Sequence, residues 1–120
     1  MKTIFTLAII VSVASHLNAA PEGLRLLEEK CSSCHMLNSS TKVKQTKISA
    51  PPMWGIMRNL QDSFATHEEG INFIIDYVMN PHIDKMVFPK AAEERFGLMP
   101  SMKGKLTDEE LKTIANYLYR

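Results

Sequence analysis

Two cysteines and a histidine stand close together in the stretch EEKCSSCHML, as Cys31, Cys34 and His35. Cysteines at this spacing can form a redox dithiol, supply half of a zinc site, or bond the vinyl groups of a haem. The histidine that follows directly adds an imidazole that can bind a metal ion. The motif alone leaves these three kinds of chemistry open, so the rest of the chain has to decide among them.

The surroundings of the motif favour covalent haem attachment. A redox dithiol normally opens a helix that follows a strand, and no strand pattern precedes Cys31. A structural zinc site needs four protein ligands, whereas the downstream histidines His67 and His82 lack zinc-finger spacing. The order C-x-x-C-H is the attachment signature of c-type haem. We therefore predict one haem c, bound through Cys31 and Cys34, with His35 as the proximal iron ligand.

A haem that transfers electrons usually has a second strong axial ligand, often methionine or histidine. Met99 stands before a proline in RFGLMPSMKGKLTDEE, just upstream of the last expected helix. Met102 competes with it, but the Met-Pro dipeptide favours Met99, and methionine is more often an adaptable packing residue than a ligand. A bis-histidine haem would use His67 or His82 in place of methionine. We expect both at the surface, His67 at a helix start and His82 just past a helix end. The predicted iron ligands are therefore His35 and Met99.

Helical patterns dominate the chain, and we find no alternating strand pattern, internal repeat or interdomain linker. Capping boxes at Thr66 with Glu69 and at Thr107 with Glu110 mark two helix starts. The expected helices cover residues 21–31, 66–80, 89–97 and 107–118. The sequence therefore predicts a small all-α domain.

Side-chain spacing predicts which face of each helix is buried. In the first helix these residues are Leu24, Leu27 and Cys31. In the two capped helices the apolar stripes are Ile71, Ile74, Ile75 and Val78, and then Leu111, Ile114, Ala115 and Leu118. The segment PPMWGIMRNL predicts a short helical turn after two prolines, and residues 38–50 form a polar surface loop.

The first twenty residues have the pattern of a secretory signal peptide. Lys2 is followed by the apolar run TIFTLAIIVSVA, which is too short for a bilayer span, and SHLNAA offers small residues for cleavage near Ala19 or Ala20. The predicted mature chain, residues 21–120, is one domain without a membrane span, exported to the periplasm or an equivalent compartment. Removing Lys2 from 14 Lys and Arg leaves 13 basic residues against 13 acidic ones. A near-neutral chain without a basic helix is a poor candidate for binding nucleic acid.

Beyond these residues, the chain resembles a class I monohaem cytochrome c. The resemblance rests on CSSCH, on LMPSMKGKLTDEELKTIANYL and on APPMWG, and it covers nearly all of residues 21–120. It implies that the Pro51 carbonyl accepts the free N–H of His35, and that Gly23 lets the first and last helices cross against Tyr117. Met53 and Trp54 would line the haem pocket or the core. The likeness is only in outline for the loop at residues 38–50 and for residues 62–97.

This resemblance implies a monomeric electron carrier that is not an enzyme. Lysines after the motif and around the Met-Pro loop could form a basic docking surface for acidic redox partners: Lys42, Lys44, Lys47, Lys103 and Lys105. They could equally be solvated loop residues. The alternatives are a peroxidase-like enzyme or a gas or redox sensor with an open sixth position on the iron, and a fixed haem subunit of a respiratory complex.

Overall fold

The computed structural model describes residues 20–38 and 49–120, and this part of the chain is helical. Its elements are α1 (Glu22–Cys31), α2 (Met53–Ser63), α3 (His67–Met79), the 3-10 turn η1 (Ile83–Lys85), α4 (Lys90–Phe96) and α5 (Asp108–Leu118). These residues contain no strand, only one isolated bridge between Lys103 and Leu106. The predicted all-α class is confirmed. The signal peptide at residues 1–19 and most of the polar loop, residues 39–48, lie outside the described residues.

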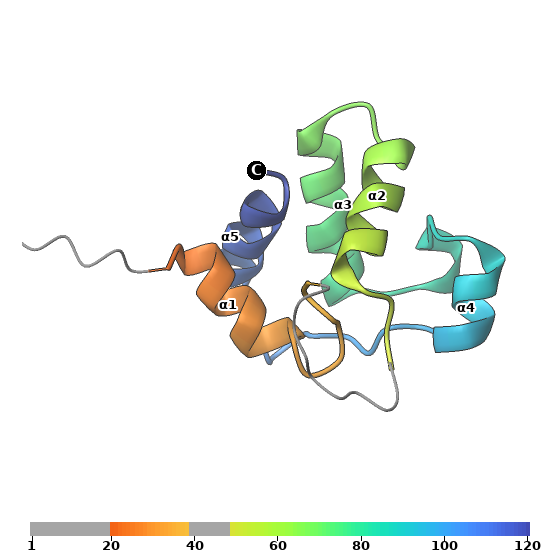
Figure 1. Cartoon of the computed structure of the whole chain (residues 1–120), viewed down its shortest axis with the longest axis horizontal. Helices are drawn as coiled ribbons and strands as arrows, with labels where there is room; N and C mark the ends of the chain where they lie inside the picture. Colours follow the sequence, from red (N-terminus) through yellow and green to blue (C-terminus); the bar gives the residue numbers. More distant parts are fainter. Residues whose placement is uncertain (1–19, 39–48) are drawn as a thin grey trace, which may run out of the picture.

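Helix α1 crosses α5 at a glycine (Figure 1). Gly23 is buried, and a methyl group added to it would overlap the Tyr117 side chain and touch the carbonyl oxygen of Thr113 at 3.0 Å. The close crossing implied by the resemblance is therefore present. The predicted buried face of α1 is partly wrong: its buried leucines are Leu26 and Leu27, because this face carries Gly23 against α5, and Leu24 is only half-buried.

Helices α3 and α5 begin as the sequence predicts. In each, a threonine hydroxyl accepts the backbone N–H of a glutamate three residues later, and the glutamate carboxylate accepts the N–H of the threonine. The two pairs are Thr66 with Glu69 and Thr107 with Glu110. Because each box satisfies two backbone donors that lack helical partners, it fixes the first residue of its helix.

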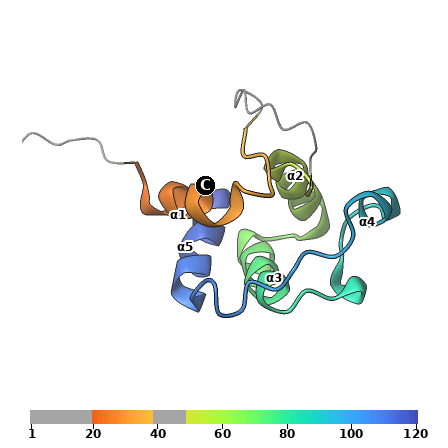
Figure 2. The same ribbon diagram turned by 90° about the horizontal axis from the view of Figure 1, so that it is seen from below.

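Helix α2 is longer than the short turn we predicted. It runs for 11 residues from Met53, and the Pro52 carbonyl accepts the first backbone bonds, from Gly55 and Ile56 at 3.0 and 3.1 Å. Prolines before a helix start are compatible with helix, since proline lacks only an N–H that has no partner there. The helix packs against α3, and the two lie side by side in Figures 1 and 2.

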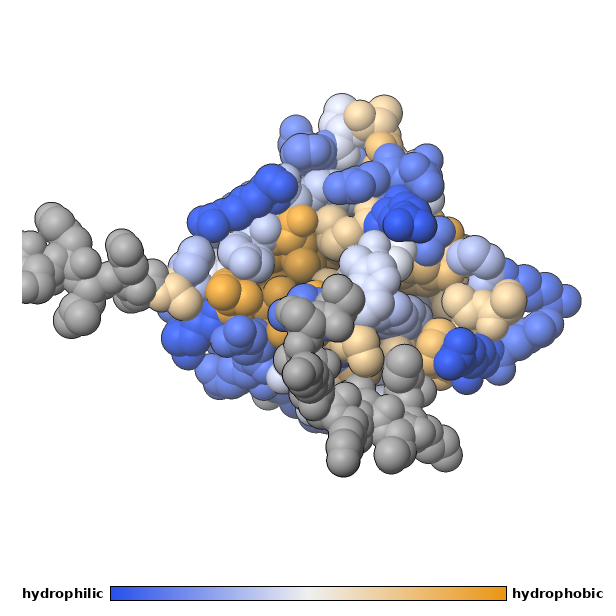
Figure 3. All heavy atoms as spheres, in the orientation of Figure 1, coloured by the Kyte–Doolittle hydropathy of each residue, from blue (hydrophilic) through white to orange (hydrophobic). Residues whose placement is uncertain are grey.

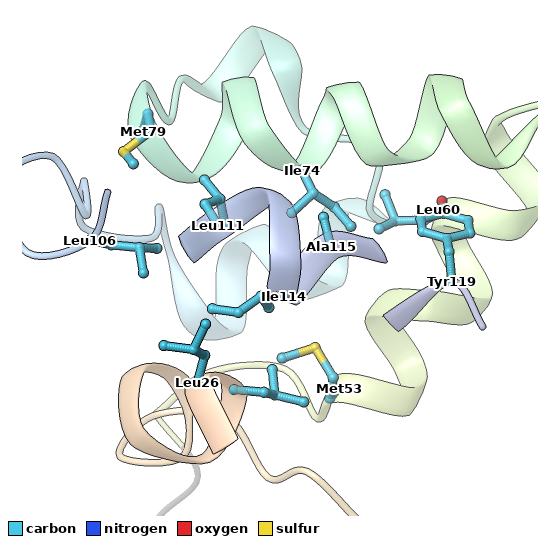
Figure 4. Packing of buried hydrophobic residues seen from close by; sticks show 11 residues of the cluster. Leu26, Met53, Leu60, Ile74, Met79, Leu106, Leu111, Ile114, Ala115 and Tyr119 are labelled. Carbon is cyan, nitrogen blue, oxygen red and sulfur yellow. The ribbon is translucent and has the colours of Figure 1, made fainter. Parts of the chain in front are cut away.

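The core gathers around α5, which packs against α1 and α3 (Figure 4). Leu60, Leu111 and Ile114 are its largest fully buried side chains, exposed by 1%, 2% and 2%. In the stripe predicted for α5, Leu111, Ile114 and Ala115 are buried and Leu118 is half-buried. In α3 the stripe is rotated, because Ile74 is buried together with Gly70, Tyr77 and Met79, whereas Ile71, Ile75 and Val78 are half-buried.

Helix α4 is set apart from this core in both ribbon views. Pro89 precedes its first residue, and Gly97 ends it with a φ of 70°, a conformation that favours glycine. The predicted short helix is therefore confirmed. Neither α4 nor η1 contains a buried residue.

Candidate haem site

The cysteine motif forms the end of α1 and the turn after it. Cys31 is the last residue of the helix, and its carbonyl accepts the backbone N–H groups of Cys34 and His35 at 3.3 and 2.9 Å. The Ser32 hydroxyl donates to the Glu28 carbonyl. This extra turn keeps both sulfurs and the imidazole on one short, hydrogen-bonded segment. Cys31 is half-buried and Cys34 is exposed, and both are free thiols.

His35 is buried, and one of its ring nitrogens has a fixed partner. The side chain is 8% exposed, and Nδ1 lies 2.7 Å from the Pro51 carbonyl oxygen. A carbonyl can only accept, so Nδ1 carries the proton and Nε2 keeps a free lone pair. Burial lowers the pKa of His35, although the hydrogen bond to Pro51 acts in the opposite direction. The lowered pKa favours the neutral imidazole, which is the form that binds metal ions.

A second hydrogen bond holds the proline segment against the motif. The Met53 backbone N–H donates to the Met36 carbonyl at 2.8 Å. Met36 directly follows His35, and Met53 lies two residues after Pro51. Two bonds between these segments fix the ring of His35 more firmly than one bond could. The partner that the resemblance implies for His35 is therefore present, and it lies two residues before the first residue of α2.

The thiol chemistry argues against a redox dithiol. Burial, with a smaller contribution from Cys34, raises the pKa of Cys31 to about 11. Attacking thiols in dithiol oxidoreductases instead have lowered pKa values, because the thiolate is the nucleophile. Nor do residues 20–38 and 49–120 bring three or more histidine, cysteine, aspartate or glutamate side chains together in a metal-binding group, which a zinc site of this composition would need.

The two candidate methionine ligands differ in their packing. Met102 is half-buried against the core, and its backbone N–H donates to the Val78 carbonyl at 3.0 Å. Met99 is half-buried in the extended segment between α4 and α5. A side chain already used in the core is less available to an iron than one that is not, so the packing favours Met99. Its ligation stays a prediction.

The two other histidines in the described residues, His67 and His82, have local partners away from the motif. His67 begins α3, at the end of the molecule next to the C-terminus, where its ring lies 5.1 Å from the ring of Tyr119. His82 is exposed, and its Nδ1 accepts the Asp84 backbone N–H at 3.2 Å. Both are at the surface, as expected from the sequence.

Met53 and Trp54 differ in burial. Met53 belongs to the core cluster and is 8% exposed, whereas Trp54 is 43% exposed. Trp54, Ile83 and Leu98 are the large apolar side chains that remain exposed in the described residues, and they come from α2, η1 and the segment after α4. On the face of the molecule drawn in Figure 3, apolar side chains reach the surface between the positions of α1 and α4 in Figure 1.

These residues fit a haem. The motif supplies two thiols and a buried imidazole with a free nitrogen, and Trp54, three residues after Pro51, adds an exposed apolar side chain. A covalently bound porphyrin needs this donor set. The fold and the site thus define a small helical protein whose C-x-x-C-H motif fits the covalent attachment of a haem.

Comparison with known proteins agrees with this class. The family described as Cytochrome c matches residues 20–119, so the chain belongs to the cytochrome c family. An uncharacterized protein of Aquifex aeolicus (strain VF5) is 30% identical, over 94% of this chain and 81% of that protein. No solved structure matches. Family membership supports haem c binding and a role in electron transfer.

Two further predictions concern the surface and the membrane. In residues 20–38 and 49–120, no helix is long and apolar enough to cross a bilayer. Lys103 and Lys105 are exposed, whereas Lys42, Lys44 and Lys47 lie outside the described residues. The basic docking surface therefore stays a prediction.

Proposed function

We propose that this cytochrome c is an exported, monomeric electron carrier of the periplasm or an equivalent compartment. In this proposal Cys31 and Cys34 would hold one haem c, and His35 and Met99 would bind its iron. The observation that carries the proposal is the buried His35, whose Nδ1 is bound by the Pro51 carbonyl at 2.7 Å. The haem, when bound, supplies a one-electron Fe(III)/Fe(II) couple.

The residues of the chain have separate tasks in this role. Pro51 fixes the tautomer and ring orientation of His35, which keeps Nε2 directed at one position and raises its basicity as a ligand. The Met99 thioether, as the second protein ligand, would favour the ferrous state and raise the reduction potential. Burial of Met53 beside the motif lowers the local polarity, which would disfavour the more highly charged ferric site. This effect would also raise the reduction potential.

The assignment of Met99 is tested by comparing two matched variants of the haem-loaded protein. Met99→Leu should abolish the weak far-red absorption of ferric iron bound to a thioether. It should also lower the reduction potential by on the order of 100 mV, a fraction of the range that axial ligands span. Met102→Leu should leave both nearly unchanged, because Met102 packs against the core.

The reverse pattern would assign the ligand to Met102 instead. A wild-type protein that lacks the far-red absorption and shows high-spin ferric iron would instead indicate an open position on the iron. That result would favour the peroxidase-like enzyme or the sensor over the carrier.

A further inference from the structure

The last carbonyl groups of α3 form a row to which the segment after Met99 is bound. The final carbonyls of a helix have no donors within it and need other partners. The Val78 carbonyl accepts the Met102 backbone N–H at 3.0 Å, and the Met79 carbonyl accepts the Ser101 hydroxyl at 2.6 Å. Residues 101–102 therefore serve as a cap for α3, and α3 in turn fixes their position.

Ser101 is the centre of this attachment, because its hydroxyl makes two hydrogen bonds. It donates to Met79, and it accepts the backbone N–H of Lys103 at 3.2 Å. The Lys103 ammonium then donates to the Asn80 side-chain oxygen at 3.2 Å. One small side chain thus couples the backbone on both sides of Met102 to the end of α3.

The attachment lies close to Met99 along the chain. Only Pro100 separates Met99 from Ser101, and the proline ring fixes its own φ angle. On the other side, Met99 follows Leu98, which is 42% exposed, and Gly97, which ends a helix without a buried residue. The position of the Met99 side chain is therefore restrained mainly from the Ser101 side.

We propose that Ser101 is the positioning residue for the Met99 ligand, through its hydroxyl bond to the carbonyl end of α3. This inference rests on the proposed function, because it assumes that Met99 binds the iron. Loss of the hydroxyl frees the segment from the Met79 carbonyl, so an external ligand competes more easily with the thioether.

The test is a titration of the ferric, haem-loaded protein with imidazole. Ser101→Ala should raise the apparent affinity for imidazole about three- to tenfold, which is the factor that corresponds to the net contribution of one hydrogen bond. Ser101→Thr keeps a hydroxyl and should restore the wild-type affinity. Thr113→Ala is the matched control, because it removes a hydroxyl that donates to the Glu109 carbonyl at 2.9 Å on α5, away from the Met99 segment.

An unchanged imidazole affinity in Ser101→Ala, or an equal increase in Thr113→Ala, would overturn the inference. If Ser101→Ala does not fold, Ser101→Val is compared with Ser101→Thr, since these two side chains have the same shape. Should both variants without a hydroxyl fail to fold while Ser101→Thr folds, the hydroxyl serves folding and the inference is wrong. The far-red absorption of the wild type separates the two proposals, because its absence refutes Met99 ligation itself.

Discussion

His35 has two ring nitrogens in different situations. Nδ1 is held by a main-chain carbonyl, and Nε2 is left to bind a metal ion. A main-chain acceptor cannot titrate, so the orientation of the imidazole does not depend on the ionisation of a neighbouring carboxylate. Pro51 orients His35 through its main-chain carbonyl, which any residue at this position would also have.

This reading predicts that Pro51→Ala is mild. Alanine keeps the carbonyl, so the variant should lose only about 0.4–1 kcal/mol of stability, which arises from the greater freedom of its unfolded chain. The Nδ1 proton of His35 should still exchange slowly with solvent in the NMR spectrum of the haem-loaded protein. Rapid exchange of that proton, with a shifted reduction potential, would mean that the proline ring itself holds the segment in place.

Among the helices, α5 is made sensitive to acid by its Thr107 capping box. Hydrogen bonds from the backbone and side chain of Thr107 lower the pKa of Glu110. A carboxyl with a lowered folded pKa adds stability above its unfolded pKa, and this contribution is lost as the pH falls through the folded pKa. The unfolded value is about 4.3.

We therefore expect Glu110→Gln to be less stable than the wild type at pH 7 and by a smaller margin at about pH 3, because the contribution of Glu110 is lost progressively as the pH falls from the unfolded value toward the lowered folded pKa. Denaturant unfolding of both proteins at the two pH values measures the difference. Glu109→Gln is the control, because Glu109 takes no part in the capping box through its side chain. A stability gap that stays the same at both pH values would show that the carboxylate bond to Thr107 contributes nothing.

Helix starts and stops could be predicted from the sequence because they depend on local chemistry. The Thr107 box and Gly97 act within a few residues of their own helix, so short patterns suffice. Helix α2 was underestimated because two prolines precede it and Gly55 lies in its first turn. Its apolar residues nevertheless keep the helical spacing: Met53, Ile56, Met57 and Leu60. The packing of these apolar residues against α3 stabilises the full helix, and this contact cannot be read from the local sequence.

Contacts between distant elements were harder to predict. Gly70 lies under the ring of Tyr119, and a methyl group added to it would overlap the phenol oxygen. Neither residue stands out in the sequence, since a glycine inside a helix has many explanations. Gly23 was recognisable only because the resemblance named its partner at Tyr117. The site residues were predictable for the opposite reason: their covalent chemistry demands a short, fixed spacing at Cys31, Cys34 and His35.

In the molecule as a whole, only some of the helices contribute to the apolar core. The core joins α1, α2, α3 and α5, whereas α4 and η1 contribute no buried residue. A chain of this size buries a modest fraction of its surface and gains much from a bound cofactor. In the proposed carrier, the exposed side chain of Leu98, next to Met99, would be available to pack against the haem.

The central claim is that a haem is covalently attached at Cys31 and Cys34 of an exported chain. The most direct test is the intact mass of the protein isolated from the periplasm of cells that express haem-maturation machinery. The expected mass is that of a chain beginning near Pro21 plus one haem, which stays with the polypeptide after denaturation. A chain with no added haem, produced beside an active assembly machinery, would contradict it.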